Sequence, residues 1–191
     1  MGRIRAVPPV KLFCGLLSGD DDLLRRARQI LEHQFGPADV VSDIWDFTQT
    51  EYYREEMGTG LRRVFIAFEQ LCHPTVLAEV KIETNAIEQR IADDVLATEI
   101  ARPVNIDPGY LDPGKLVLAT TKDRAHRVCI GQGIFAEVTL QYVADRWRSA
   151  EWTYPDYQTP HYHAYFTQVR DRLRVQRRSL DSQRDRDVPI T

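Results

Sequence analysis

Residues 134–142 (IFAEVTLQY) carry an apolar side chain at every second position, whereas the other positions include Glu137, Thr139 and Gln141. A period of two is that of a β-strand buried on one side. The preceding Gly131-Gln132-Gly133 predicts a tight reversal from a short strand over residues 127–130. The pattern therefore predicts an antiparallel sheet with one covered face.

The chain before this hairpin predicts strands and helices in alternation. Apolar runs predict strands over residues 11–17, 40–47, 61–68 and 116–121. Helical spacing of apolar residues predicts one helix from the aspartates at 20–22 to Gly36-Pro37, and a second over residues 74–91. The triplets Asp107-Pro108-Gly109 and Asp112-Pro113-Gly114 predict two turns.

The order strand–helix–strand–strand–helix–strand, followed by antiparallel strands, predicts an α+β fold. Its first half fits a ferredoxin-like split βαβ unit, which an antiparallel β-meander and a C-terminal helix over residues 163–178 extend. We predict a single domain over residues 8–178 and a flexible polar tail over residues 179–191.

Composition narrows the class of protein. The chain has 191 residues, with 25 basic against 28 acidic side chains, so net charge gives no case for nucleic acid. No apolar run approaches the ~20 residues that a membrane span needs. The three cysteines lie far apart in sequence, which predicts buried thiols in a reducing cytoplasm rather than a disulfide framework or a zinc site.

Residues 109–115 (GYLDPGK) have the GxxxxGK spacing of a phosphate-binding P-loop. That motif continues with Ser or Thr and opens a helix, whereas this chain has Leu116 and a predicted strand. We therefore interpret these residues as turns and reject a P-loop.

One candidate site is a polar row on the helix predicted over residues 74–91. Lys81, Asn85 and Glu88 fall at i, i+4 and i+7, so they line up beside the apolar face of the helix. A polar row at the edge of a core suits the wall of a cleft. An ordinary solvated row of side chains explains the same spacing, and it is the commoner case.

A second candidate site is the open face of the sheet, where Asn105 projects with Asp107 and Glu137 projects with Thr139. If the reversal pairs Ile130 with Ile134, Arg127 falls opposite Glu137. The adjoining turn adds the titratable residues Lys122, Asp123 and His126. Such a cluster is a candidate site, although a cross-strand ion pair and turn chemistry explain it equally well.

Aromatic residues suggest a third element of the same cleft. Residues 152–157 (WTYPDY) suit either a platform on which a base stacks or a loop that covers the sheet edge. Tyr53 and Glu56, in the polar segment between two predicted strands, are candidates for the mouth of the cleft.

Several blocks of sequence together are familiar: EYYREEMG (51–58), LAEVKIETNAIEQ (77–89), RPVNIDPGYL (102–111), residues 115–142 and WTYPDY (152–157). Over residues 8–172 the chain resembles DUF4416, an uncharacterised prokaryotic family whose members often carry the genome label "GTP-binding protein". The resemblance implies no established activity, catalytic residues or cofactor. The label has little support here, because the chain lacks a P-loop and a guanine-specifying NKxD motif.

The leading hypothesis is binding or turnover of a small phosphorylated or nucleotide-like ligand in a polar cleft on the sheet face, with magnesium as the candidate cofactor. Asp107, His126 and Glu137 are the candidate catalytic residues, and Asp107 and Glu137 are the candidate magnesium ligands. The candidate ligand-binding residues are Tyr53, Glu56, Lys81, Asn85, Glu88, Asn105, Lys122, Arg127, Tyr154, Asp156 and Tyr157. The hypothesis requires Lys81, Asp107 and Glu137 to meet in one pocket.

Two other classes compete with it. A non-catalytic module for RNA or protein would use the arginine-bearing C-terminal helix and tail for charge, and the sheet face or aromatic loop for stacking. A scaffold subunit would carry the same polar residues merely as surface.

Overall fold

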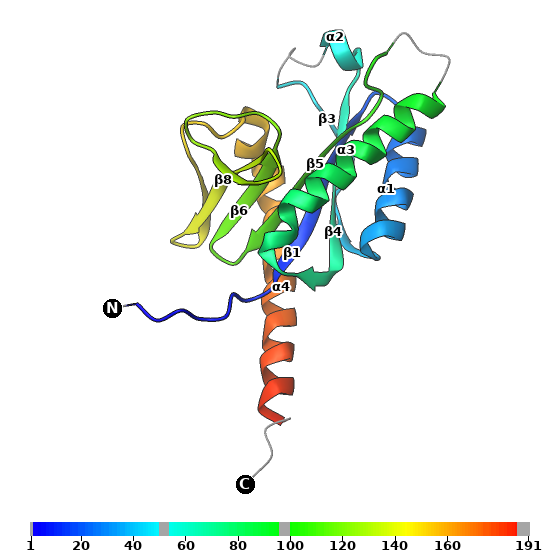
Figure 1. Ribbon diagram of the computed structural model, residues 1–191. Coiled ribbons are helices and arrows are strands. Elements are labelled where there is room, and N and C mark those ends of the chain that lie inside the picture. The colour runs from blue at the N-terminus through cyan, green and yellow to red at the C-terminus, as the bar shows by residue number, and fades with distance from the viewer. Residues whose placement is uncertain (1, 50–53, 96–99, 187–191) are drawn as a thin grey trace.

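The computed structural model describes residues 2–49, 54–95 and 100–186, and in this part of the chain it has an α+β fold (Figure 1). One antiparallel nine-stranded sheet has the order β2-β4-β1-β5-β6-β8-β7, with β3 paired to β4 and β9 paired to β8. The strands are β1 (Val10–Ser18), β2 (Ala38–Val41), β3 (Trp45–Asp46), β4 (Arg62–Cys72), β5 (Asn105–Asp112), β6 (Lys115–Thr120), β7 (Val128–Gly131), β8 (Ile134–Val143) and β9 (Arg146–Ser149). The helices are α1 (Asp21–Phe35), α2 (Arg54–Met57), α3 (Leu77–Asp94) and α4 (Pro160–Arg186), with 3₁₀ turns η1 (Pro74–Val76) and η2 (Pro155–Gln158).

The first half has the predicted ferredoxin-like arrangement. β4 lies beside β1, β2 lies outside β4, and β5 pairs with the other edge of β1, all antiparallel. α1 connects β1 to β2 and α3 connects β4 to β5. The Asp20 side chain caps α1 by accepting a hydrogen bond from the Asp22 amide at 2.7 Å. The sequence prediction of fold class is therefore confirmed.

The two faces of β1 belong to different cores. Leu12, Cys14 and Leu16 pack in an aliphatic cluster with α1 and α3, which lie on one face of the sheet (Figure 1). Phe13 points to the opposite face, where it joins the aromatic residues of α4. The sheet is thus covered on both sides in its first half.

α4 is longer than predicted at both ends. Its buried residues, among them Phe166, Val169 and Leu173, pack on the sheet, and its C-terminal turns extend beyond the body (Figure 1). Residues 179–186, expected in a flexible tail, are helical, while residues 187–191 lie outside the described part. No helix in the described ranges is both long enough and apolar enough to cross a membrane.

One of the two predicted turns is wrong, because β5 includes it. The strand runs straight through Asp107-Pro108-Gly109, and only the second triplet forms a turn, which joins β5 to β6. Glycine is required at position 109 because neighbouring atoms approach its backbone closely. A Cβ at this position would lie 2.5 Å from the Val117 carbonyl oxygen and 2.7 Å from the Phe13 ring. The proline precedes the first residue that pairs with β6, so its missing N–H does not interrupt that ladder.

The pairing of β5 with β6 is short, and this positions the site. Gly109–Asp112 pair with Lys115–Leu118, whereas the part of β5 before Gly109 pairs with β1 alone. Ala119 and Thr120, at the far end of β6, pair with β8 alone. The two strands therefore separate beyond Gly109, and side chains from both sheet faces reach the opening.

The cysteines differ in exposure from the prediction. Cys14 is buried, Cys72 is half-buried and Cys129 is exposed on β7, at the edge of the sheet. All three are free thiols. The expectation of uniformly buried thiols is therefore wrong for Cys129.

Candidate functional site

A cleft of about 600 Å³ lies where β5 and β6 separate. It is lined from β4, α3, β5, β6, the loop over residues 121–127, β8 and the segment over residues 152–157. The predicted site residues that line it are Lys81, Asn85, Asn105, Asp107, Lys122, His126, Arg127, Glu137, Tyr154, Asp156 and Tyr157. Lys81, Asp107 and Glu137 thus meet in one cleft, as the leading hypothesis requires.

Two predicted residues, Glu56 and Glu88, are not part of this lining, and Tyr53 lies outside the described residues. Glu88 is buried behind the cleft, where its carboxylate accepts hydrogen bonds from Arg102 at 2.7 and 3.0 Å. Glu56 lies 3.9 Å from the same guanidinium. Both glutamates therefore contact Arg102, which does line the cleft.

Lys81 and Glu88 bind the backbone of β5 in the part of this strand that does not pair with β6. The Lys81 ammonium donates to the Ile106 carbonyl oxygen at 2.9 Å, and the Ile106 amide donates to Glu88 at 2.7 Å. Both side chains are buried, so the interpretation of this row as solvated is wrong for these two residues. They supply the partners that a neighbouring strand would have given to Ile106.

Arg63 on β4 is the centre of the buried end of the cleft. Only 2% of the residue is exposed, and its guanidinium donates to Asp107 at 3.2 Å and lies 4.0 Å from Asp156. Its charge also lies over the Phe47 ring, 5.3 Å from the centroid. Gly15 on the neighbouring strand β1 leaves the space, because a Cβ there would lie 3.0 Å from the Arg63 guanidinium and 2.7 Å from the Phe65 ring.

The two carboxyls beside Arg63 differ in acidity. Burial raises the pKa of Asp107, but the charges of Arg63 and Lys81 and the hydrogen bonds from Arg63 and Asn105 outweigh it, so the pKa lies below its ordinary value. Asn105 donates to Asp107 at 2.7 Å, as expected for residues that share a strand face. Burial raises the pKa of Asp156, and Arg63 only partly offsets this. Asp107 therefore keeps its charge, and Asp156 is the first of the two to take a proton.

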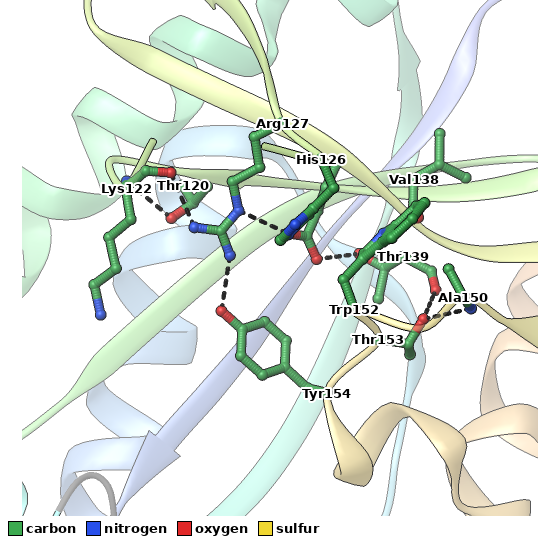
Figure 2. Close-up of polar contacts among 11 residues, drawn as sticks. Thr120, Lys122, His126, Arg127, Val138, Thr139, Ala150, Trp152, Thr153 and Tyr154 are labelled. Atoms are coloured by element: carbon green, nitrogen blue, oxygen red, sulfur yellow. Dashed lines mark hydrogen bonds and ion pairs between the residues drawn. The ribbon is translucent and has the colours of Figure 1, made fainter. Parts of the chain in front are cut away.

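Arg127 is the centre of the exposed rim. Its guanidinium donates to Glu137 at 2.8 Å, to the Lys122 carbonyl at 2.9 Å and to the Tyr154 hydroxyl at 2.9 Å (Figure 2). Its position opposite Glu137 agrees with the predicted hairpin register, since Val128 pairs with Ala136. The closing pair differs, because a bulge after Cys129 brings Gly131 rather than Ile130 opposite Ile134.

His126 completes the rim. One ring nitrogen, Nε2, lies 3.2 Å from Glu137, and the imidazole stacks on Trp152 with ring centroids 5.2 Å apart (Figure 2). The Trp152 indole donates to the Val138 carbonyl at 3.1 Å, which fixes the stacking surface on β8. The Thr139 hydroxyl donates to the other oxygen of Glu137 at 3.1 Å. Glu137 is therefore held by three side chains.

The described lining carries twice as many basic as acidic residues. The basic ones are Arg63, Lys81, Arg102, Lys122, Arg124 and Arg127, and the acidic ones are Asp107, Glu137 and Asp156. Asp107 and Glu137, the candidate magnesium ligands, each contact a different arginine. Within the described ranges, no group of three or more His, Cys, Asp and Glu side chains is placed to hold a metal ion.

Sequence reasoning missed several lining residues, above all Arg63. It lies in the apolar run of β4 (RRVFIAF), and a charged residue inside a buried strand is a signal in itself, because burial requires a partner. Arg102 and Arg124 were missed for lack of any local pattern. The others are Phe47, Gln49, Leu118, Ala119, Thr120 and Thr121, whereas Trp152 and Pro155 belong to the aromatic block proposed as a stacking platform.

Residues 8–173 match the model of a family described as a domain of unknown function, DUF4416. This match covers most of the chain, so the protein belongs to that family, as the sequence blocks predicted. No curated protein and no solved structure matches the chain. The function must therefore be argued from the cleft.

Proposed function

We propose that the cleft binds a small phosphorylated or nucleotide-like ligand. The observation that carries this proposal is the six-to-three excess of basic over acidic residues in the described lining, in a chain whose net charge is −3. A concave site with a local excess of one sign of charge concentrates ions of the opposite sign. Its volume of about 600 Å³ lies within the range of small-molecule sites.

Aromatic side chains favour a ligand that also has a flat group. Trp152 and Tyr154 are 42% and 44% exposed, and both line the cleft beside the basic loop over residues 121–127. Exposed rings fixed by hydrogen bonds offer a stacking surface without further ordering of the chain. A nucleotide or a similar phosphorylated ring compound combines both features.

Turnover of such a ligand would use His126. Its Nε2 faces Glu137 in the rim, and histidine is the side chain most often used for general acid–base catalysis. Asp107 and Glu137 act in this proposal by orienting Arg63, Arg127 and His126. Mg²⁺ in phosphate-binding sites uses one or two carboxylates together with phosphate oxygens, so magnesium would enter with the ligand.

The alternative of an RNA- or protein-binding module through α4 has less support. Arg172 donates to Asp39 at 2.7 Å, and Arg177 donates to Asp112 at 2.9 Å. Both arginines thus attach α4 to the sheet instead of presenting free charge. We also propose a cytoplasmic location, in line with three free cysteines, one of them exposed.

Thermal-shift measurements would test the proposal. The probes are AMP, CMP, GMP, UMP, ribose 5-phosphate and inorganic pyrophosphate, each with and without Mg²⁺ at low salt. A compound at 100 times its Kd adds about 2.7 kcal/mol to the free energy of unfolding. We expect at least one phosphorylated compound to stabilise the chain. Stabilisation by none of them at millimolar concentration would contradict the proposal.

A matched pair of variants locates the binding. Arg124→Ala removes an exposed cation from the cleft, and Arg25→Ala removes an exposed cation from α1, outside the cleft. We expect Arg124→Ala to weaken binding about fivefold, the value of one charge contact of about 1 kcal/mol. Arg25→Ala should leave binding unchanged. Equal effects of the two variants would mean that the cleft is not the site.

A further inference from the structure

Two buried polar atoms of the cleft have no hydrogen-bond partner among the described residues: Arg63 Nε and the Tyr157 hydroxyl. Both residues are 2% exposed and both line the cleft. An unpaired buried donor costs about 1–3 kcal/mol, and native structures contain few of them. Two such atoms in residues that line one cleft are hydrogen-bonding capacity that no described residue uses.

The Tyr157 ring is fixed independently of its hydroxyl. It stacks on Phe166 with centroids 5.8 Å apart, and it meets the edges of Phe65 and Tyr162. Burial raises the pKa of Tyr157 well above its ordinary value although the Arg63 charge opposes this, so the hydroxyl stays protonated and can donate. Arg63 Nε–H is likewise a donor in a side chain whose other nitrogens face Asp107 and Asp156.

The buried end has no surplus of positive charge. Arg63 and Lys81 are matched there by Asp107 and Asp156, and the sixth basic lining residue, Arg102, is paired with Glu88. The surplus lies at the rim, where Lys122, Arg124 and Arg127 stand against Glu137 alone among the described lining residues. A phosphate is therefore favoured at the rim, whereas the buried end suits a group without net charge.

We propose that the buried end binds the uncharged, hydrogen-bonding head group of the ligand, of the nucleobase class, through an acceptor atom that takes both Arg63 Nε–H and the Tyr157 hydroxyl. The phosphate then lies at the rim beside Arg124. This inference rests on the proposed function and adds the orientation of the ligand. It also makes head-group selectivity a property of Arg63 and Tyr157, because a site with unpaired buried donors rejects a ligand that cannot satisfy them.

Calorimetric titration tests this orientation with AMP, CMP, GMP, UMP and ribose 5-phosphate as probes. We expect at least one nucleotide to bind more tightly than ribose 5-phosphate. Tyr157→Phe should weaken the binding of that nucleotide about fivefold, which is the value of one neutral hydrogen bond. The affinity for ribose 5-phosphate should stay unchanged. The control is Tyr165→Phe, which removes a buried hydroxyl outside the cleft that contacts the Val40 carbonyl.

Tyr157→Phe removes an unpartnered hydroxyl, so the variant should fold. Arg63→Lys, which keeps the charge and lacks Nε–H, serves as the second variant and should lose the same nucleotide preference. If the variants lose affinity equally for the nucleotide and for ribose 5-phosphate, or lose it for neither, the orientation is wrong. Binding that still depends on Arg124 would in that case uphold the proposed function. Absence of binding by every probe would overturn both.

Discussion

The cleft contains two arginine–carboxylate centres that have the same chemistry and differ in their hydrogen bonds. Arg63 and Asp107 lie on neighbouring parts of the sheet at the buried end, and Arg127 and Glu137 lie across the β7–β8 hairpin at the rim. Every guanidinium nitrogen of Arg127 has a partner, on Glu137, Lys122 and Tyr154. Arg63 has one nitrogen, Nε, without a partner among the described residues.

This difference distinguishes an arginine that stabilises the cleft from an arginine that is a candidate for ligand binding. The completed bonds of Arg127 close the loop over residues 122–127 and hold Tyr154 at the rim, so that arginine stabilises the shape of the cleft. The incomplete bonds of Arg63 cost stability in the free protein. An arginine that is buried, paired with a carboxylate and still incomplete is the better candidate for ligand contact.

Removal of the Arg63 charge should have the largest effect on stability. Arg63→Met leaves Asp107 without its arginine partner and Asp156 without its nearest cation, so we expect a loss of about 3–5 kcal/mol in the free energy of unfolding. Urea denaturation measures this loss. Arg62→Met is the control, because Arg62 is partly exposed and pairs with Asp21, so about 1 kcal/mol or less is expected. A similar small loss in both variants would contradict the central role of Arg63.

Gly15→Ala tests the space that Arg63 occupies. The new methyl group would meet the Arg63 guanidinium and the Phe65 ring, so we expect a loss of about 1–3 kcal/mol by thermal or chemical denaturation. Gly114→Ala provides the comparison, since its Cβ meets only Asp112 at an ordinary 3.8 Å. If both variants are equally stable, the packing around Arg63 is looser than described.

Two tyrosine variants sharpen the comparison between the centres. Tyr154→Phe removes a partner of Arg127, and about 0.5–1.5 kcal/mol of stability should be lost. Tyr157→Phe removes a hydroxyl that has no partner among the described residues, and it should be neutral or stabilising. Differential scanning calorimetry on both proteins compares them directly. The opposite order of stabilities would show that the hydroxyl of Tyr157 is paired in the free protein.

The pH dependence of stability should distinguish the two carboxyls at Arg63. Asp107, with its pKa lowered from 3.8, contributes stability above that pH and loses it as the pH falls through the folded pKa. Asp156, with its pKa raised from 3.8, lowers stability as the pH rises from 3.8 through its folded pKa. Asp107→Asn should therefore destabilise the chain at pH 7, and Asp156→Asn should stabilise it there. The Asp156→Asn difference should disappear as the pH falls through the folded pKa of Asp156 towards 3.8, whereas the Asp107→Asn difference should shrink only below pH 3.8. Equal signs at pH 7 would refute the assignment.

The sequence was most informative where local periodicity determines structure. The alternation in residues 134–142 and the glycines at 131 and 133 predicted the hairpin that places Arg127 opposite Glu137. The same strand logic predicted that Asn105 and Asp107 share a face. The i, i+4, i+7 row correctly grouped Lys81 and Asn85 at one wall of the cleft.

What the sequence did not predict depends on contacts between distant segments. Asp107-Pro108-Gly109 has the letters of a turn, but it pairs with the distant strand β1 and is itself a strand. The partners of Arg63 are Asp107, Asp156 and Tyr162, which lie far along the chain. The separation of β5 from β6, which creates the cleft, is likewise a property of the sheet as a whole.

Nuclear magnetic resonance of the arginine side chains tests the central claim most directly. In ¹⁵N-labelled protein titrated with AMP, CMP, GMP and UMP in turn, the Arg63 Nε–H signal, assigned by its absence in Arg63→Lys, should shift with at least one nucleotide. Backbone signals of residues 105–107, 118–127 and 152–157 should shift with it, and the Arg127 Nε–H signal should move less. Shifts confined to the arginines of α4, or no shift with any nucleotide, would contradict the account.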